Sequence, residues 1–198
     1  MPLRFEGLIL ASASPRRLKL LAKIGVQFQV VPSELAEIPP LDELPNAYAA
    51  RMALEKGLSV AASYPDHLVI AADTVVSVDD RILGKPRSTR DAEAMLLALS
   101  DRWHDVWTGV AMVCGRRNVE CVRAVRSEVR FRVLTPEEVA EYVSTGEPMD
   151  KAGAYAIQGG AGRFVSRVKG SYHNIIGLPT VEVARMLNEL GYPLGDEG

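Results

Sequence analysis

The chain has 198 residues, of which 47% are hydrophobic and 24% are charged, and its formal net charge is −2. This length and apolar content suffice for one substantial core, so we expect a single domain over residues 1–198. The balanced charge argues against general nucleic-acid binding, and no apolar run is long enough to span a membrane. We therefore expect a cytoplasmic protein that binds a small ligand, with no nucleic-acid or membrane partner.

The stretch Leu8–Leu21, LILASASPRRLKLL, joins a short apolar run to the start of a basic helix. Ser14 is a good N-cap, and the proline after it suits the first helical position, where its missing N–H costs nothing. The free N–H groups and the dipole of such a helix start attract phosphate. Ser12, Arg16 and Arg17 lie beside this start. The stretch predicts a phosphate site, although a capped helix with two solvated arginines fits the same pattern.

The first helix should run from Pro15 to about Lys23, with Leu18, Leu21 and Ala22 on its inner face. Gly25 then ends it in the usual C-terminal manner.

Residues 26–31 alternate apolar and polar side chains, which predicts a strand with one exposed face. Residues 33–45 follow with three prolines and four acids, which is typical of a loop. Glu34 and Glu37 are notable there, because a carboxylate on a loop that faces an anion site can hold a metal. A solvated acidic loop is the alternative.

Asn46 is expected to cap the next helix, whose apolar residues recur at helical spacing as far as Ala61. Lys56 lies beside that apolar stripe. A lone lysine in this position is ordinarily solvated.

Residues 67–78, HLVIAADTVVSV, predict a buried strand that Asp73 interrupts. A carboxylate among apolar neighbours must be paired, metal-bound or protonated, so we favour a functional role for it. Thr74 beside it can donate or accept a hydrogen bond. Residues 79–80 predict a two-residue hairpin turn, and the strand that returns from it should bring Lys85 alongside Asp73.

The second half of the chain predicts further helices and a long antiparallel pair of strands. A helix begins at Thr89, strands cover 103–113 and 119–134, and residues 135–138 form a capping box. A strand over 163–168 and a turn over 169–174 precede the last helix, expected from Pro179 to Leu190. The two cysteines lack metal-site spacing and should be reduced core residues, and the arginines of the second strand should form a solvated face. His173 shows no evident partner and is left out of the catalytic residues.

Residues 147–160, EPMDKAGAYAIQGG, combine glycines and small side chains that let backbone approach a ligand. Gln158 offers one donor group and one acceptor to a flat partner, which suits the edge of a nucleobase. A glycine-bracketed turn with an exposed amide is the alternative.

Several of these blocks resemble, in order, the signature of the Maf family of nucleoside triphosphate pyrophosphatases. They are Ser12–Arg17, Ala72–Thr74 with Gly84–Pro86, Asp150–Gly153 with Gln158-Gly159, and Asn174–Pro179. The resemblance covers nearly the whole chain. It implies an α/β fold with a long, curved, mixed sheet flanked by helices, and two lobes around a central cleft. It is also compatible with a homodimer.

The resemblance implies hydrolysis of a nucleoside triphosphate to the monophosphate and pyrophosphate, as a nucleotide-pool house-cleaning enzyme. Ser12, Ser14 and Arg17 would bind phosphate, and Lys56 and Lys85 would act with Asp73 in catalysis. Glu37 and Asp73 would hold a divalent cation, Mg²⁺ or Mn²⁺, which prefer carboxylate ligands. Whether Asp73 is the general base or a metal ligand stays open. Specificity would come from Arg16, Thr74 and Gln158, a combination that belongs to the branch acting on thymidine and uridine triphosphates.

Two alternatives remain. The family name derives from septum formation, so the chain could be a nucleotide-binding regulator of cell division. It could also be a pyrophosphatase for purine nucleotides, either inosine and xanthosine triphosphates or 7-methylated guanosine triphosphate.

Overall fold

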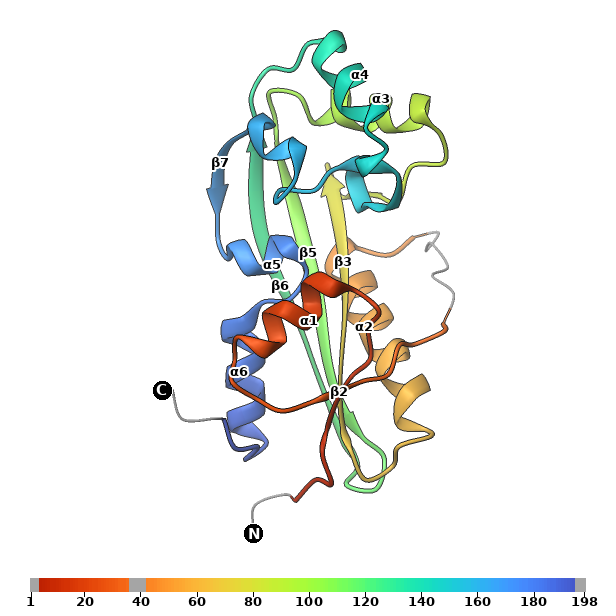
Figure 1. Ribbon diagram of the computed structural model, residues 1–198, viewed down its shortest axis with the longest axis vertical. Helices are drawn as coiled ribbons and strands as arrows, with labels where there is room; N and C mark the ends of the chain where they lie inside the picture. The colour runs from red at the N-terminus through yellow and green to blue at the C-terminus, as the bar shows by residue number, and fades with distance from the viewer. Residues whose placement is uncertain (1–3, 36–41, 195–198) are drawn as a thin grey trace.

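The computed structural model describes residues 4–35 and 42–194 and shows a sheet with helices on both faces (Figure 1). The strands are β1 Leu8–Leu10, β2 Gln29–Val30, β3 Leu68–Val78, β4 Arg81–Leu83, β5 Trp103–Cys114, β6 Val119–Phe131 and β7 Val165–Lys169. The helices are α1 Pro15–Ala22, α2 Pro45–Ala61, α3 Thr89–Leu99, α4 Pro136–Ser144, α5 Tyr172–Ile176 and α6 Thr180–Glu189. Short 3-10 helices are η1 Glu147–Asp150, η2 Ala152–Ala154 and η3 Gly160–Phe164. No helix in the described ranges has both the length and the apolarity to cross a bilayer.

The sheet of the described residues has seven strands in the order β2-β1-β3-β5-β6-β7, with β4 paired to β3. Strand β1 lies parallel to β2 and β3, and the other pairs are antiparallel. The long strands β3, β5 and β6 run through most of the length of the molecule (Figure 1). The predicted α/β class, with a mixed sheet flanked by helices, is confirmed.

The two faces of β3 pack against different helices, and this difference positions the site. Ile70 and Ala72 pack with α1 and α6 on one face, whereas Ala71 packs with α2 on the other. Successive side chains of a strand point to opposite faces. Asp73 therefore faces the α2 side and Thr74 faces the α1 side, so one dipeptide contacts two helices.

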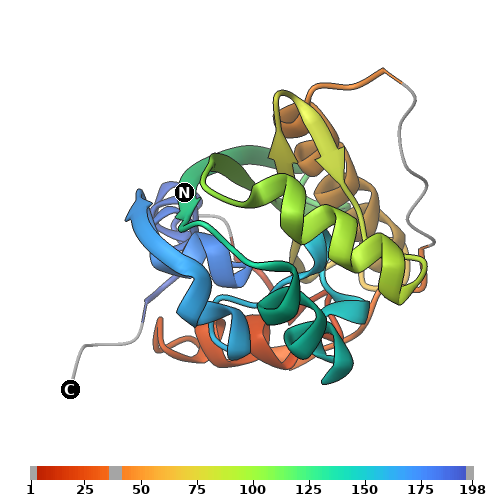
Figure 2. The same ribbon diagram turned by 90° about the horizontal axis from the view of Figure 1, so that it is seen from above.

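Two large apolar cores lie at different ends of the long strands. One packs α3 and α4 around Phe131, Tyr142 and Phe164, at the top of Figure 1. The other packs α1 and α6 against β1 and β3 in the lower half. Figure 2 looks down on the α3 and α4 end and shows α1 and α2 approaching the sheet from different sides. The structure thus has the two lobes that we expected.

Helix α2 packs very closely on β5. Gly109 makes this contact possible, because a Cβ there would lie 2.0 Å from the carbonyl oxygen of Ala49. Gly57 on the helix meets Val113 in the same way, with 3.1 Å between a built Cβ and Cγ2. The missing side chains let the helix lie low on the sheet, so Lys56 can reach β3.

Several local predictions are confirmed. Asp79 and Asp80 both have positive φ, 50° and 58°, as a type I′ hairpin turn requires. Thr135 and Glu138 form the capping box. Both cysteines are free thiols, and Cys114 is buried as expected, whereas Cys121 is only partly buried. The arginines of β6 pair with acids at the protein surface, as Arg126 does with Asp105.

Other local predictions are wrong. Leu18 is 40% exposed, and Leu20 is buried beside Leu21 instead. The reason is that Arg17 points inward, so the inner face follows positions 17, 20, 21 and 24. Asn46 does not cap α2, because the helix begins at the preceding proline with Leu44 as its N-cap.

The remaining differences concern short elements. Only two residues of the expected strand 26–31 pair with β1, which is itself three residues long. Strand β7 begins at Val165 rather than at 163, because η3 continues to Phe164. The expected turn at 169–174 contains the start of α5, which Ser171 caps.

Candidate active site

One cleft collects the residues that the sequence predicts for the site. Its volume is about 1470 Å³. Nine of the ten predicted residues line it, namely Ser12, Ser14, Arg16, Arg17, Lys56, Asp73, Thr74, Lys85 and Gln158. The tenth, Glu37, lies outside the described residues, so its role as a metal ligand stays a prediction.

The start of α1 forms one end of the cleft, as the sequence predicts. Ser14 is the N-cap, and its hydroxyl accepts a hydrogen bond from Arg17 N at 3.5 Å. Ser12 Oγ in turn accepts from Ser14 N at 3.2 Å. Pro15 occupies the first turn, and Arg16 is exposed beside it. The positive end of the helix thus opens on the cleft with two hydroxyls and a solvent-facing arginine.

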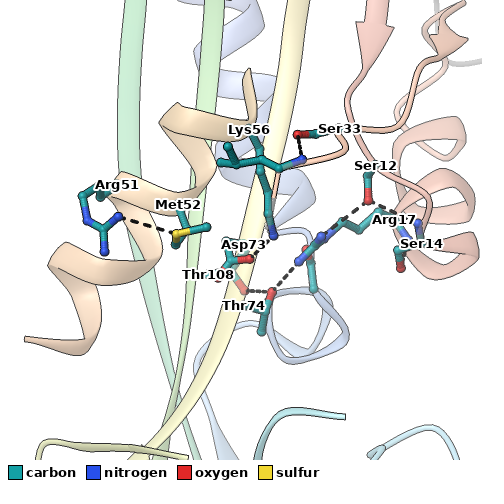
Figure 3. A network of polar contacts seen from close by, with 12 residues as sticks. Ser12, Ser14, Arg17, Ser33, Arg51, Met52, Lys56, Asp73, Thr74 and Thr108 are labelled. Atoms are coloured by element: carbon teal, nitrogen blue, oxygen red, sulfur yellow. Dashed lines mark hydrogen bonds and ion pairs between the residues drawn. The ribbon is translucent and has the colours of Figure 1, made fainter. Parts of the chain in front are cut away.

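Asp73 forms an ion pair with Lys56 inside the cleft (Figure 3). Lys56 Nζ lies 2.6 Å from Asp73 Oδ1, and the two residues are 8% and 5% exposed. Of the three states that the sequence leaves open for this carboxylate, the structure shows the paired one. Lys56 is accordingly buried, although a lone lysine on a helix is ordinarily solvated. Lys56 thus balances the charge of the carboxylate that β3 buries.

Arg17 spans the cleft from α1 to β3 and is held at three points (Figure 3). Its Nε donates to the carbonyl oxygen of Gly177 at 2.9 Å. Its terminal nitrogens donate to Ser12 Oγ at 3.4 Å and to Thr74 Oγ1 at 3.2 Å. These contacts fix the plane of the guanidinium group before any ligand binds.

Two threonine hydroxyl groups, linked by a hydrogen bond, connect Arg17 to the backbone of another segment. Thr74 and Thr108 lie directly opposite in the β3–β5 register, and their Oγ1 atoms are 2.9 Å apart. Thr108 donates its proton to the carbonyl oxygen of Asn174 at 3.0 Å. Since a threonine has one such proton, Thr74 must be the donor to Thr108. Each group therefore donates to the next one, in the order Arg17, Thr74, Thr108 and the carbonyl oxygen of Asn174.

Sequence reasoning gave no site role to three members of this arrangement, Thr108, Asn174 and Gly177, although the last two lie in the Asn174–Pro179 block. Thr108 is fully buried in a long apolar strand, and Asn174 is fully buried in the short helix α5. A buried hydroxyl or amide in such a run signals a hydrogen-bond network. The strand register that brings these residues to Arg17 is absent from the sequence pattern.

The other lobe supplies the facing side of the cleft. Lys85 follows β4, and Gln158 follows η2; both side chains are exposed. Asp150 and Lys151 line the same cleft and form an ion pair. The pKa of Asp150 is lowered, mainly by its hydrogen bond with Lys151 and to a smaller extent by Arg16. Side chains from both lobes thus share one electrostatic environment.

The donor groups in the cleft fit a divalent cation that arrives with a triphosphate. Among residues 4–35 and 42–194, no three His, Cys, Asp or Glu side chains gather as metal ligands. Asp73 contributes one buried carboxylate, and only its Oδ1 bonds Lys56. Mg²⁺ is commonly held by one or two carboxylates together with substrate phosphates and water. A single protein carboxylate is therefore consistent with such a site.

Fold and cleft together define an α/β protein with a large two-lobed site that can bind a polyanionic ligand of nucleotide size. The chain belongs to the Maf-like protein family, whose family model matches residues 7–190. The predicted family membership is confirmed.

Similar proteins carry one common name. A relative in Myxococcus xanthus is 48% identical over 94% of this chain and 94% of its own. Relatives in Koribacter versatilis and Desulfotalea psychrophila are 47% and 46% identical, over 93% and 92% of this chain and 95% and 93% of their own. All three are named dTTP/UTP pyrophosphatase.

A solved structure with a similar arrangement is that of the Staphylococcus aureus Ham1 protein. It matches with a TM-score of 0.45 and 18% identity, over 64% of this chain and 72% of the other.

Proposed function

We propose that this protein is a nucleoside triphosphate pyrophosphatase that hydrolyses dTTP and UTP to the monophosphate and pyrophosphate. One observation carries the proposal: a single cleft holds a buried carboxylate–ammonium pair beside an arginine fixed at three points, next to a helix start. Relatives at 46–48% identity that span almost the whole chain are named dTTP/UTP pyrophosphatase. The physiological role that follows is the removal of stray nucleotides from the pool.

The phosphates would bind at the α1 end of the cleft. Ser12 and Ser14 offer hydroxyl groups, and the first turn of α1 offers backbone N–H groups. Arg17 would hold a phosphate oxygen in a fixed direction, because its guanidinium group is already oriented. Lys85 would add a positive charge from the other lobe.

Asp73 would accept the proton of the attacking water. In this step the water oxygen bonds to a phosphorus of the α–β phosphoanhydride while the bond from that phosphorus to the bridging oxygen breaks. Pyrophosphate and the monophosphate separate, and the proton goes to the carboxylate. Lys56 would hold Asp73 in the orientation that this role requires.

A divalent cation, Mg²⁺ or Mn²⁺, would be held by Asp73 and by Glu37. When bound, such an ion supplies neutralisation of the charge on the triphosphate oxygens.

Base choice would rest on Gln158, Arg16 and Thr74. Gln158 is exposed on the lining of the cleft, where its amide can pair with a base edge. Thr74 bonds Arg17 and Thr108, so its contribution would be to orient Arg17 rather than to touch the base.

The test is a panel of canonical and modified nucleoside triphosphates with Mg²⁺ or Mn²⁺, in which monophosphate and pyrophosphate are measured separately. We expect pyrophosphate release mainly from dTTP and UTP, and loss of turnover in a folded Asp73→Asn variant. A preference for inosine or 7-methylguanosine triphosphate would indicate a purine enzyme instead. Absence of turnover with every substrate and either metal would overturn the enzymatic proposal and favour a nucleotide-binding regulator of division.

A further inference from the structure

The turn over residues 156–160 is held at both ends by side chains from another part of its lobe. At one end, Ala156 N donates to the phenolic oxygen of Tyr142 at 3.2 Å. At the other end, Gly160 N donates to both carboxylate oxygens of Glu147, at 3.2 and 3.1 Å. Gln158 lies midway between these two anchor points.

The two anchors are themselves joined. The Tyr142 hydroxyl donates to Glu147 Oε1 at 2.8 Å, so its oxygen remains an acceptor for Ala156 N. Tyr142 is 1% exposed, and burial together with Glu147 raises its pKa, which keeps the hydroxyl protonated as a donor. Thr145 Oγ1 also accepts from Glu147 N at 3.2 Å, which fixes the start of η1. Helix α4 and η1 thus form one rigid support for the turn.

The carboxylate of Glu147 lies against the backbone inside the turn. A Cβ at position 159 would lie 2.1 Å from Glu147 Oε1, so only Gly159 permits this approach. A Cβ at position 160 would lie 3.2 Å from the Tyr142 ring. Gly159 therefore admits the carboxylate that holds the turn, and Gly160 lies in close contact with the Tyr142 ring.

We propose that Glu147 is a positioning residue for base selection, because with Tyr142 it fixes the turn that presents Gln158 to the cleft. Glu147 does not line the cleft in the described structure and would not touch the substrate. Its effect would pass through Gln158 alone. This inference rests on the proposed function, because it concerns how the same site chooses its base.

The experiment compares Glu147→Gln, Gln158→Ala and the double variant, each in the full chain with Mg²⁺. Loss of the charged acceptor at Gly160 N should lower the ratio of kcat/KM for UTP over GTP about tenfold. The change should fall mainly in KM, since the groups around Asp73 are untouched. In the Gln158→Ala background, Glu147→Gln should leave the ratio unchanged, which a general loss of structure would not do.

Glu141→Gln is the matched control. Glu141 lies on the same helix α4 and pairs with Arg163 of η3 at 3.1 Å on the surface, and it is not one of the side chains that hold residues 156–160. It should retain the wild-type ratio. If Glu147→Gln does not fold, Tyr142→Phe removes both hydroxyl contacts while keeping the ring, and it should shift the ratio in the same direction.

Calorimetric binding of UTP and GTP separates this inference from the proposed function. Failure of the wild type to hydrolyse UTP would count against the function, while the ratio of binding constants would still report on Glu147. A wild-type ratio in both Glu147→Gln and Tyr142→Phe would overturn the inference. The inference would also be overturned if Glu147→Gln changed the UTP over GTP ratio equally in the wild-type and Gln158→Ala backgrounds.

Discussion

Replacing Lys56 with methionine tests how strongly the site depends on the buried ion pair. Methionine keeps most of the length and apolar surface of the lysine stem, so the change mainly removes the charge from Asp73. Removal of one partner from a buried pair costs about 3–5 kcal/mol.

We therefore expect Lys56→Met to lose about 3–5 kcal/mol of unfolding free energy. Urea unfolding followed by circular dichroism measures this loss. Turnover of UTP should be lost as well, because Asp73 no longer has the partner that orients it.

Lys169→Met provides the control for burial. Lys169 is 60% exposed in its side chain and lies 3.8 Å from Glu128, so its loss should cost less than about 1 kcal/mol. A Lys56→Met deficit as small as that of the control would refute the argument.

Three further predictions follow from other contacts. Thr108→Val removes the acceptor for the hydroxyl chain beneath Arg17, and steady-state kinetics should show a rise in KM for UTP of about tenfold. Burial lowers the pKa of His104 to about 3, so the unfolded chain gains this proton first as the pH falls. His104→Gln should therefore remove up to about 1.4 kcal/mol per pH unit of acid destabilisation between pH 6 and pH 3, measured by urea unfolding. Gly109→Ala should lose about 3 kcal/mol or more in thermal unfolding, because its Cβ would overlap the α2 backbone.

Each of these predictions has a result that would contradict it. An unchanged KM in Thr108→Val would mean that Arg17 needs no support from the hydroxyl chain. Parallel pH profiles of wild type and His104→Gln would mean that the buried imidazole does not titrate differently in the two states. Gly84→Ala is the control for Gly109→Ala, since no atom lies within 4 Å of its built Cβ, and it should stay within about 0.5 kcal/mol of the wild type. Equal losses in both glycine variants would remove close packing as the explanation.

The predictions were correct where neighbouring residues decide the structure, and wrong where residues far away in the chain decide it. Ser14 at the start of α1 and the turn at Asp79-Asp80 were predicted correctly, because capping and positive φ depend on a few adjacent residues. The inner face of α1 was predicted wrongly. The predicted face followed the spacing of the apolar residues, whereas Arg17 turns inward to hydrogen-bond partners that lie far away in the chain.

By itself, the sequence indicated that Asp73 is unusual, and its family resemblance predicted that residues of several distant blocks lie around one cleft, as nine of the ten do. A carboxylate in an apolar strand signals a stabilising partner wherever it occurs, because burying an unpaired charge is so costly. The tertiary structure alone decided which partner this is. Gly109 lets α2 approach the sheet and bring Lys56 to one face of β3, while strand alternation turns Thr74 to Arg17 on the other. Such contacts depend on strand register and on the distance between helix and sheet, and neither can be inferred from the local order of residues.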